Sequence, residues 1–123
     1  NGYCTVGGVD TCSPLRTGSP ADLQVITADG MLTDESLFLT ALEPGVPVAA
    51  YAPLYGSMMS GSAFAVASAA LMVKNQRLYA APERTNPHRL PLVAATAPAP
   101  LHRVECIDCN CRGGVATISL ARC

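Results

Sequence analysis

The residues with the greatest chemical potential in this sequence are its six cysteines, which lie in groups at the two ends of the chain. They are Cys4, Cys12, Cys106, Cys109, Cys111 and Cys123. The later group has C-x-x-C-x-C spacing, and with His102 or Cys123 it has enough ligands for a zinc ion. Structural zinc sites usually take two Cys-x-x-Cys knuckles, however, and the remaining cysteines are far away in the sequence. Disulfides therefore account better for the six, and we expect no metal and no cofactor.

A disulfide framework implies an oxidising compartment. The sequence starts at Asn1 with neither Met nor a charged and apolar leader, which is how an exported protein looks once its signal peptide has been removed. We therefore expect a secreted protein.

Residues for catalysis are few. His88 and His102 are the histidines that could act as bases near neutral pH, and neither lies beside a nucleophile motif or an acidic partner at a motif spacing. Asp34 and Glu35 are adjacent, so on a strand they would point to opposite faces and could not act together on one substrate. The sequence predicts a protein that is not an enzyme.

The elements that must position any site are arranged around a long uncharged stretch. From Pro44 to Val73 the chain has no Asp, Glu, Lys or Arg. We expect a strand over 46–52 and then a helix at about 61–74 that is apolar on nearly every side, as is typical of a helix covered on more than one face. A small polar segment in the middle of the stretch argues against a membrane span.

Length and charge narrow the class of protein further. A chain of 123 residues forms one domain with a single core. A net charge of −1 gives no basic surface for nucleic acid or for an anionic membrane. We expect neither nucleic-acid binding nor membrane insertion.

The pattern along the chain predicts a mainly β domain with one helix. Residues 1–20 are rich in Gly, Ser, Thr and Pro and are expected to form an irregular arm pinned by disulfides, and 21–123 to form the domain. Strands are expected at 23–27, 36–42, 46–52, 77–80, 90–96, 101–106 and 115–121.

This order of strands around a single helix resembles the B subunits of pertussis-like and subtilase-type exotoxins over about residues 19–111. The resemblance rests on the bend at Gly30, the strand ending at Phe38, the helix, and a late cysteine after a Val-rich strand. It implies a small OB-type barrel that assembles into a ring of five subunits. It also implies a non-catalytic toxin subunit that binds host glycans and carries an enzymatic A chain.

In that family the glycan lies near a Ser before the first strand and a Tyr on the strand after the helix. The matching positions here are Ser19 and Tyr79, and Arg77 beside the tyrosine could pair with the carboxylate of a sialic acid. Taken alone, each residue has an ordinary structural role, as a turn residue, a half-buried strand residue and a surface charge respectively. Weak sugar contacts of this kind would gain strength from repetition around a lectin ring.

The resemblance also implies a local disulfide from Cys106 to Cys109 or Cys111, with Cys4, Cys12 and Cys123 joining the two termini. A different class of function is left open by the same sequence. The chain could instead be an exported, disulfide-rich β-domain whose apolar middle docks against another protein as a structural module.

Overall fold

The computed structural model describes residues 5–11, 20–28, 36–56, 58–82, 86, 88–109 and 114–123. Its strands are β1 (Thr5–Thr11), β2 (Leu23–Ile26), β3 (Val48–Ala50), β4 (Arg77–Leu78), β5 (Ala97–Pro98), β6 (Arg103–Cys109) and β7 (Val115–Ala121). Its helices are α1 (Ser36–Ala41), α2 (Ala52–Tyr55) and α3 (Gly61–Asn75).

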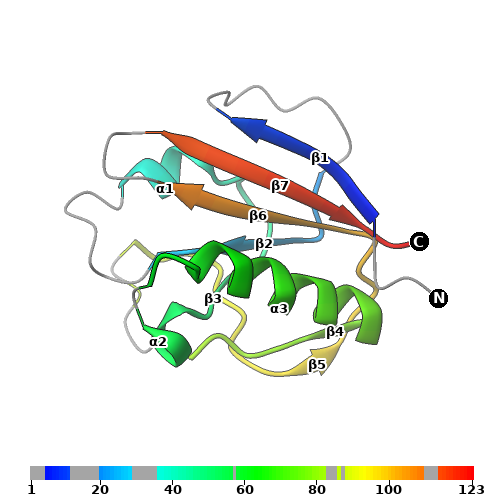
Figure 1. Ribbon diagram of the computed structural model, residues 1–123. Coiled ribbons are helices and arrows are strands. Elements are labelled where there is room, and N and C mark those ends of the chain that lie inside the picture. Colours follow the sequence, from blue (N-terminus) through cyan, green and yellow to red (C-terminus); the bar gives the residue numbers. More distant parts are fainter. Residues whose placement is uncertain are drawn as a thin grey trace.

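Five of these strands form one mixed sheet in the order β1-β7-β6-β2-β3. Strands β3 and β6 both run parallel to β2, whereas β7 runs antiparallel to β6 and to β1. Figure 1 shows the sheet with α3 lying across one face, and the short antiparallel pair β4-β5 lies beyond that helix. The described part of the chain therefore has an open α/β architecture.

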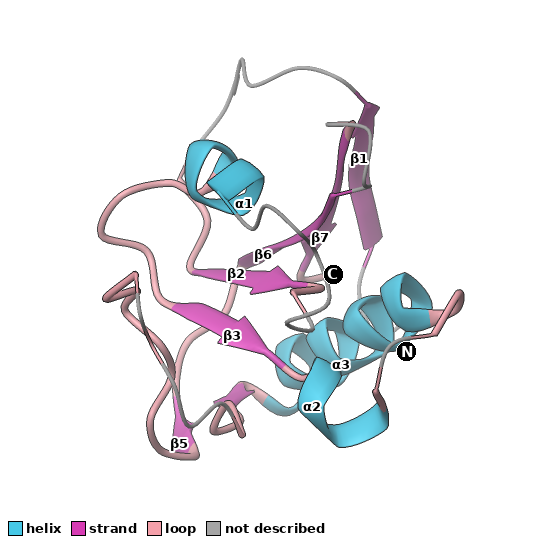
Figure 2. Ribbon diagram, turned by 90° about the vertical axis from the view of Figure 1, so that its left-hand side faces the viewer, coloured by secondary structure: helices cyan, strands magenta, loops and turns pink. Residues whose placement is uncertain are grey.

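Parallel pairing explains why helices separate the strands. Two parallel neighbours need a crossover between them, and α1 lies within the crossover from β2 to β3 while α3 lies within the one from β3 to β6. All four residues of β2 are buried, as expected for a parallel strand covered on both faces. Figure 2 shows α1 and α3 on opposite sides of the sheet.

The larger core lies between α3 and the sheet. Ala65, Ala69, Met72 and Val73 are buried, and their spacing places them on one face of α3. They pack against buried apolar residues of the central strands and of the segment before β6. These include Leu23, Val25, Ala49, Leu101, Val104 and Leu120. A second core under α1 contains Ile26, Phe38, Val48, Ala50, Ile107 and Cys109.

Helix α3 ends at a specific cap. Gln76 takes the left-handed conformation with φ of 49°, and its backbone N–H reaches the carbonyls of Met72 and Val73. The Gln76 amide also donates to the Leu101 carbonyl at 2.8 Å and accepts from the Leu101 N–H at 3.1 Å. Gln76 thus ends the helix through its backbone and joins it, through its side chain, to the segment just before β6.

The expected fold class, a mainly β OB-type barrel with one helix, is wrong. The sheet is open, and residues 36–41, which were expected to form a strand, form α1. Apolar residues at Leu37 and Leu39 fit the alternation typical of a strand. The segment nevertheless connects two parallel strands, and such a crossover lies on the face of the sheet instead of within it. The expected helix at about 61–74 lies at Gly61–Asn75.

The N-terminal segment also differs from its expected form. Within the span expected to be an irregular arm, Thr5–Thr11 form strand β1 at the edge of the sheet, paired with β7. The Gly, Thr and Val residues of this segment do not by themselves predict a strand. Its partner strand lies at the other end of the sequence, so the pairing could not be predicted from nearby residues either.

The expected disulfides are not formed among the described cysteines. Cys106, Cys109 and Cys123 are not joined in disulfides, and Cys4, Cys12 and Cys111 lie outside the described residues. Cys106 and Cys109 cannot pair because residues three apart on a strand point to opposite faces. Cys106 packs in the core under α3 and Cys109 in the core under α1.

Candidate binding pocket

A hollow of about 170 Å³ opens where the carboxyl ends of β2, β3 and β6 meet the start of α3. In open α/β sheets this is the edge at which ligands usually bind. The described lining residues come from segments far apart in the sequence. They are Thr27, Ala52, Tyr55, Gly56, Met58, Met59, Gly61, Ser62, Asp108 and Cys109.

The polar part of the hollow is centred on Asp108. Its two carboxylate oxygens each accept a hydroxyl proton, one from Thr27 at 2.5 Å and one from Ser62 at 2.6 Å. Thr27 follows β2, Ser62 lies in the first turn of α3, and Asp108 lies near the end of β6. The carboxylate therefore joins three elements at the edge of the sheet, close to the positive end of the α3 dipole.

The rest of the wall is apolar and rich in methionine. Met58 and Met59 are exposed at the rim, and the ring of Tyr55 stacks on Phe64 with the centroids 5.0 Å apart. The Tyr55 hydroxyl donates to the Gly61 carbonyl at 3.3 Å. Unbranched thioether side chains adapt to ligands of different shape, so this rim suits an apolar chain.

The thiol of Cys109 is held protonated. Burial raises its pKa to about 11, and the negative charge of the adjacent Asp108 adds to the effect. Because the thiolate is the nucleophilic form, Cys109 is unreactive near neutral pH.

A second surface feature is the outer face of α3. Phe64 and Leu71 are 48% and 45% exposed, and Ala63 and Ala67 beside them are exposed as well. The helix is therefore apolar on its outer face as well as on the face that packs on the sheet. A contiguous apolar face of this kind usually marks an interaction surface.

Arg77 and Tyr79, two of the residues expected to bind a glycan, are not among the residues that line this pocket. Arg77 lies exposed on β4, and Tyr79 follows that strand. The Tyr79 hydroxyl accepts a hydrogen bond from the Asn75 amide at 2.7 Å, and its carbonyl accepts one from the Tyr51 hydroxyl at 2.7 Å. Tyr79 is thus tied into the base of α3. Ser19 lies outside the described residues.

The zinc alternative finds no support in the described part of the chain, where no group of three or more His, Cys, Asp or Glu side chains is placed to hold a metal ion. No described helix is long and apolar enough to cross a membrane.

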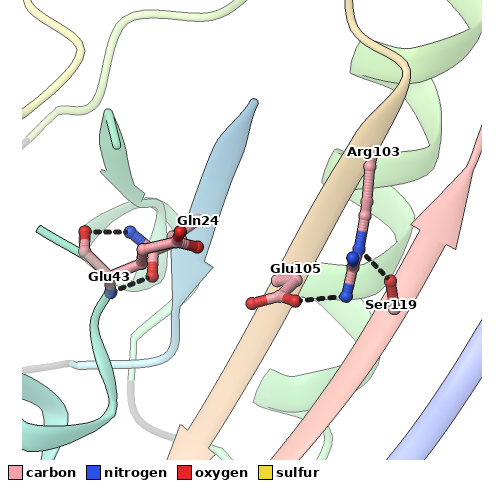
Figure 3. A network of polar contacts seen from close by, with 5 residues as sticks. All are labelled: Gln24, Glu43, Arg103, Glu105 and Ser119. Carbon is pink, nitrogen blue, oxygen red and sulfur yellow. Dashed lines mark hydrogen bonds and ion pairs between the residues drawn. The ribbon is translucent and has the colours of Figure 1, made fainter. Parts of the chain in front are cut away.

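Another polar network lies on the α1 face of the sheet (Figure 3). Arg103 contacts Glu105 at 2.8 Å and the Ser119 hydroxyl at 3.0 Å, and Glu105 is almost fully buried. On the neighbouring strand, Gln24 accepts from the Glu43 N–H at 2.6 Å and donates to the Glu43 carbonyl at 3.1 Å. These contacts stabilise strand pairing and the chain entering β3.

Sequence reasoning missed the residues of the pocket. Asp108 lies between two cysteines of the late group, and Met58 lies in the small polar segment in the middle of the uncharged stretch. The signal that could have found them was the position of each just beyond an apolar strand or just before an apolar helix. That signal depends on parallel strand pairing, which the expected OB-type barrel did not suggest.

No family model and no curated protein matches the chain. Solved structures do match it, at low sequence identity. Aligned over 98% of this chain, with a TM-score of 0.77 and 10% identity, is a structure described as a type II polyketide synthase acyl-carrier protein in complex with its ketosynthase bound to the hexaketide. The ishigamide ketosynthase/chain length factor aligns over 84% of this chain with a TM-score of 0.72 and 18% identity.

A third match is an oxazolomycin ketosynthase domain from Streptomyces albus JA3453, aligned over 97% of this chain with a TM-score of 0.69 and 16% identity. The chain spans 39%, 28% and 44% of the lengths of these three structures. At these identities the likeness establishes the fold alone. The chain has the fold of one part of ketosynthase-type proteins.

These matches overturn the resemblance to toxin B subunits. The similar structures are polyketide synthase proteins, and none is a lectin or a pertussis-like or subtilase-type subunit. A sialic acid site, a pentamer and an enzymatic A chain therefore have no support, and neither does the alternative of a disulfide-rich docking module. The order of strands around one helix was compatible with both folds, because spacing along the chain does not reveal whether neighbouring strands are parallel.

Proposed function

We propose that this chain is a non-catalytic part of a ketosynthase-type assembly, in which it binds an acyl chain and packs against a second α/β unit. The observation that carries the proposal is the alignment of 98% of this chain with 39% of a ketosynthase-containing structure at a TM-score of 0.77. The remainder of that structure has no counterpart in these 123 residues.

The outer face of α3 supports the second half of the proposal. Each large apolar side chain that becomes fully buried contributes about 1.5–3 kcal/mol, so covering Phe64 and Leu71 would yield a substantial part of an association energy. A second unit with the same helix-covered sheet would offer a similar apolar face. We therefore place the partner on α3, either as another part of the same polypeptide or as a separate ketosynthase-type chain.

The pocket supports the first half. Its rim of methionine and tyrosine suits an aliphatic chain, and its protonated thiol and hydrogen-bonded carboxylate suit binding better than reaction. The hollow lies beside the first turn of α3, so a unit packed on that helix would border its open side. A ligand held there would contact both units.

The test uses the complete protein and the N-acetylcysteamine thioester of hexanoic acid. Isothermal titration calorimetry measures binding, and chromatography follows the thioester over hours. We expect saturable binding with no loss of thioester beyond that in buffer. Absence of binding would contradict the acyl-chain role. Cleavage of the thioester that depends on the protein would contradict the non-catalytic role.

A further inference from the structure

We propose that the pocket selects acyl chains bearing a hydroxyl group near the thioester over chains bearing a ketone at the same position. The group that makes the selection is the carboxylate of Asp108. This inference rests on the proposed function and names the class of chain that the pocket accepts.

The first step concerns which hydrogen-bonding groups remain available in the hollow. Thr27 and Ser62 already donate their hydroxyl protons to Asp108, so those protons are committed. Each carboxylate oxygen has two lone pairs, so an oxygen that accepts one hydrogen bond, from Thr27 or from Ser62, can accept another. The polar centre of the pocket is therefore an acceptor for ligand groups. It matches a ligand that donates a proton.

The second step concerns charge. Among the described lining residues Asp108 is the one with a formal charge at neutral pH, so a ligand carboxylate would meet repulsion. A ligand cation would be attracted by the carboxylate but would lie at the positive end of the α3 dipole, which opposes it. A neutral hydroxyl avoids both costs. A ketone oxygen can only accept hydrogen bonds. Beside this carboxylate it would lose its hydrogen bonds to water without gaining one from a protein donor.

The third step concerns size and shape. A cavity of about 150 Å³ is large enough for a six-carbon ring, so the hollow of about 170 Å³ accepts a short acyl chain. Met58, Met59 and Tyr55 supply the apolar wall for its methylene groups, while Asp108 meets the polar substituent. A six-carbon chain with oxygen at its third carbon has both features.

The experiment compares three kinds of N-acetylcysteamine thioester on the complete protein: hexanoyl, 3-hydroxyhexanoyl as each of its two enantiomers, and 3-oxohexanoyl. A hydrogen bond to a charged acceptor is strong enough to give at least a 10-fold preference. We expect the better 3-hydroxy enantiomer to bind about 10-fold or more tightly than the 3-oxo compound. Equal binding, or tighter binding of the 3-oxo compound, overturns this inference while leaving the proposed function in place.

Asp108→Asn gives a sharper test because an amide can donate as well as accept. We expect the preference for the 3-hydroxy compound to fall to about 3-fold or less, and Glu43→Gln, which removes one carboxylate outside the pocket, to retain it. A preference unchanged in Asp108→Asn overturns the role of Asp108. Circular dichroism establishes that each variant is folded, and if Asp108→Asn does not fold, the preference of the unmodified protein decides alone. Failure of all three thioesters to bind overturns the proposed function and this inference together.

Discussion

Cys109 lies at the boundary between the core under α1 and the pocket, and its surroundings determine its chemistry. Its pKa is raised from 9.0 to about 11, first by burial and then by Asp108. A thiol whose pKa is higher in the folded protein favours folding while it is protonated. That contribution is complete below pH 9.0, where the unfolded thiol is also protonated, and is lost as the pH rises through about 11.

We therefore expect the free energy of unfolding to fall between about pH 9 and pH 11, and Cys109→Ala to make that fall shallower. Urea denaturation at a series of pH values measures it. Cys123→Ala, which alters an exposed thiol, serves as the control and should retain the original slope. Identical slopes for the two variants would contradict the assigned cause. Burial raises the pKa of Tyr51 to about 12, so in both variants the loss of stability extends to higher pH.

Two methionines show how strongly the position of a side chain determines its contribution to the free energy of unfolding. Met72 is fully buried between α3 and the sheet, whereas Met59 is fully exposed at the pocket rim. We expect Met72→Ala to lower the free energy of unfolding by about 2–5 kcal/mol, because it removes apolar contacts and leaves a cavity. Met59→Ala should change it by about 0.5 kcal/mol or less. Chemical denaturation of both variants tests the core, and similar losses would mean that Met72 is not packed as described.

At the scale of elements, Gln24 holds the chain that enters β3. Its amide makes paired hydrogen bonds with the backbone of Glu43, much as a neighbouring strand would. Replacing Gln24 by Leu leaves that backbone N–H and carbonyl without this partner, so we expect a loss of about 1–3 kcal/mol in denaturation experiments. A loss near zero would show that water or a neighbouring group replaces the amide.

Several elements could be predicted from sequence because their signals are local. The apolar run at 23–27 contains β2, the alternating run at 115–121 coincides with β7, and the uninterrupted apolar stretch before Lys74 is α3. The short helix α1 could not, because six residues give too few turns to separate a helical pattern from alternation. The pairing of β1 with β7 is equally invisible, since nothing near Thr5 indicates a partner beyond residue 115.

The candidate site was harder to predict than the fold because it depends on strand direction. Thr27, Ser62 and Asp108 meet only if β2 and β6 are parallel neighbours with α3 between them in the chain. The expected OB-type barrel gives no reason for the same three residues to meet. The expected glycan residues depended on topology in the same way, since Ser19, Tyr79 and Arg77 were chosen by their places in a barrel that the chain does not form.

At the scale of the whole molecule, the outer face of α3 is the surface on which the proposed function places the second unit. We expect Leu71→Asp to weaken binding of the second unit by about 10-fold or more, because a charge replaces an apolar side chain at a surface that becomes buried. Native mass spectrometry of the complete protein measures the binding of a separate unit. Thermal unfolding of the complete protein measures the packing of a covalently linked unit. Thr40→Asp, on α1 across the sheet, is the control. Equal effects of the two substitutions would place the partner elsewhere.

The edge position of β1 has a consequence for how the protein is made. On the ribosome β1 is synthesised before any other described strand, yet its partner β7 is the last, with Thr5 opposite Ala121. Until β7 has emerged, β1 has no place in the sheet, and the apolar side of α3 is covered only in part. The strand order therefore delays completion of the sheet until the last strand is available, and unpaired strand edges of this kind promote aggregation until then.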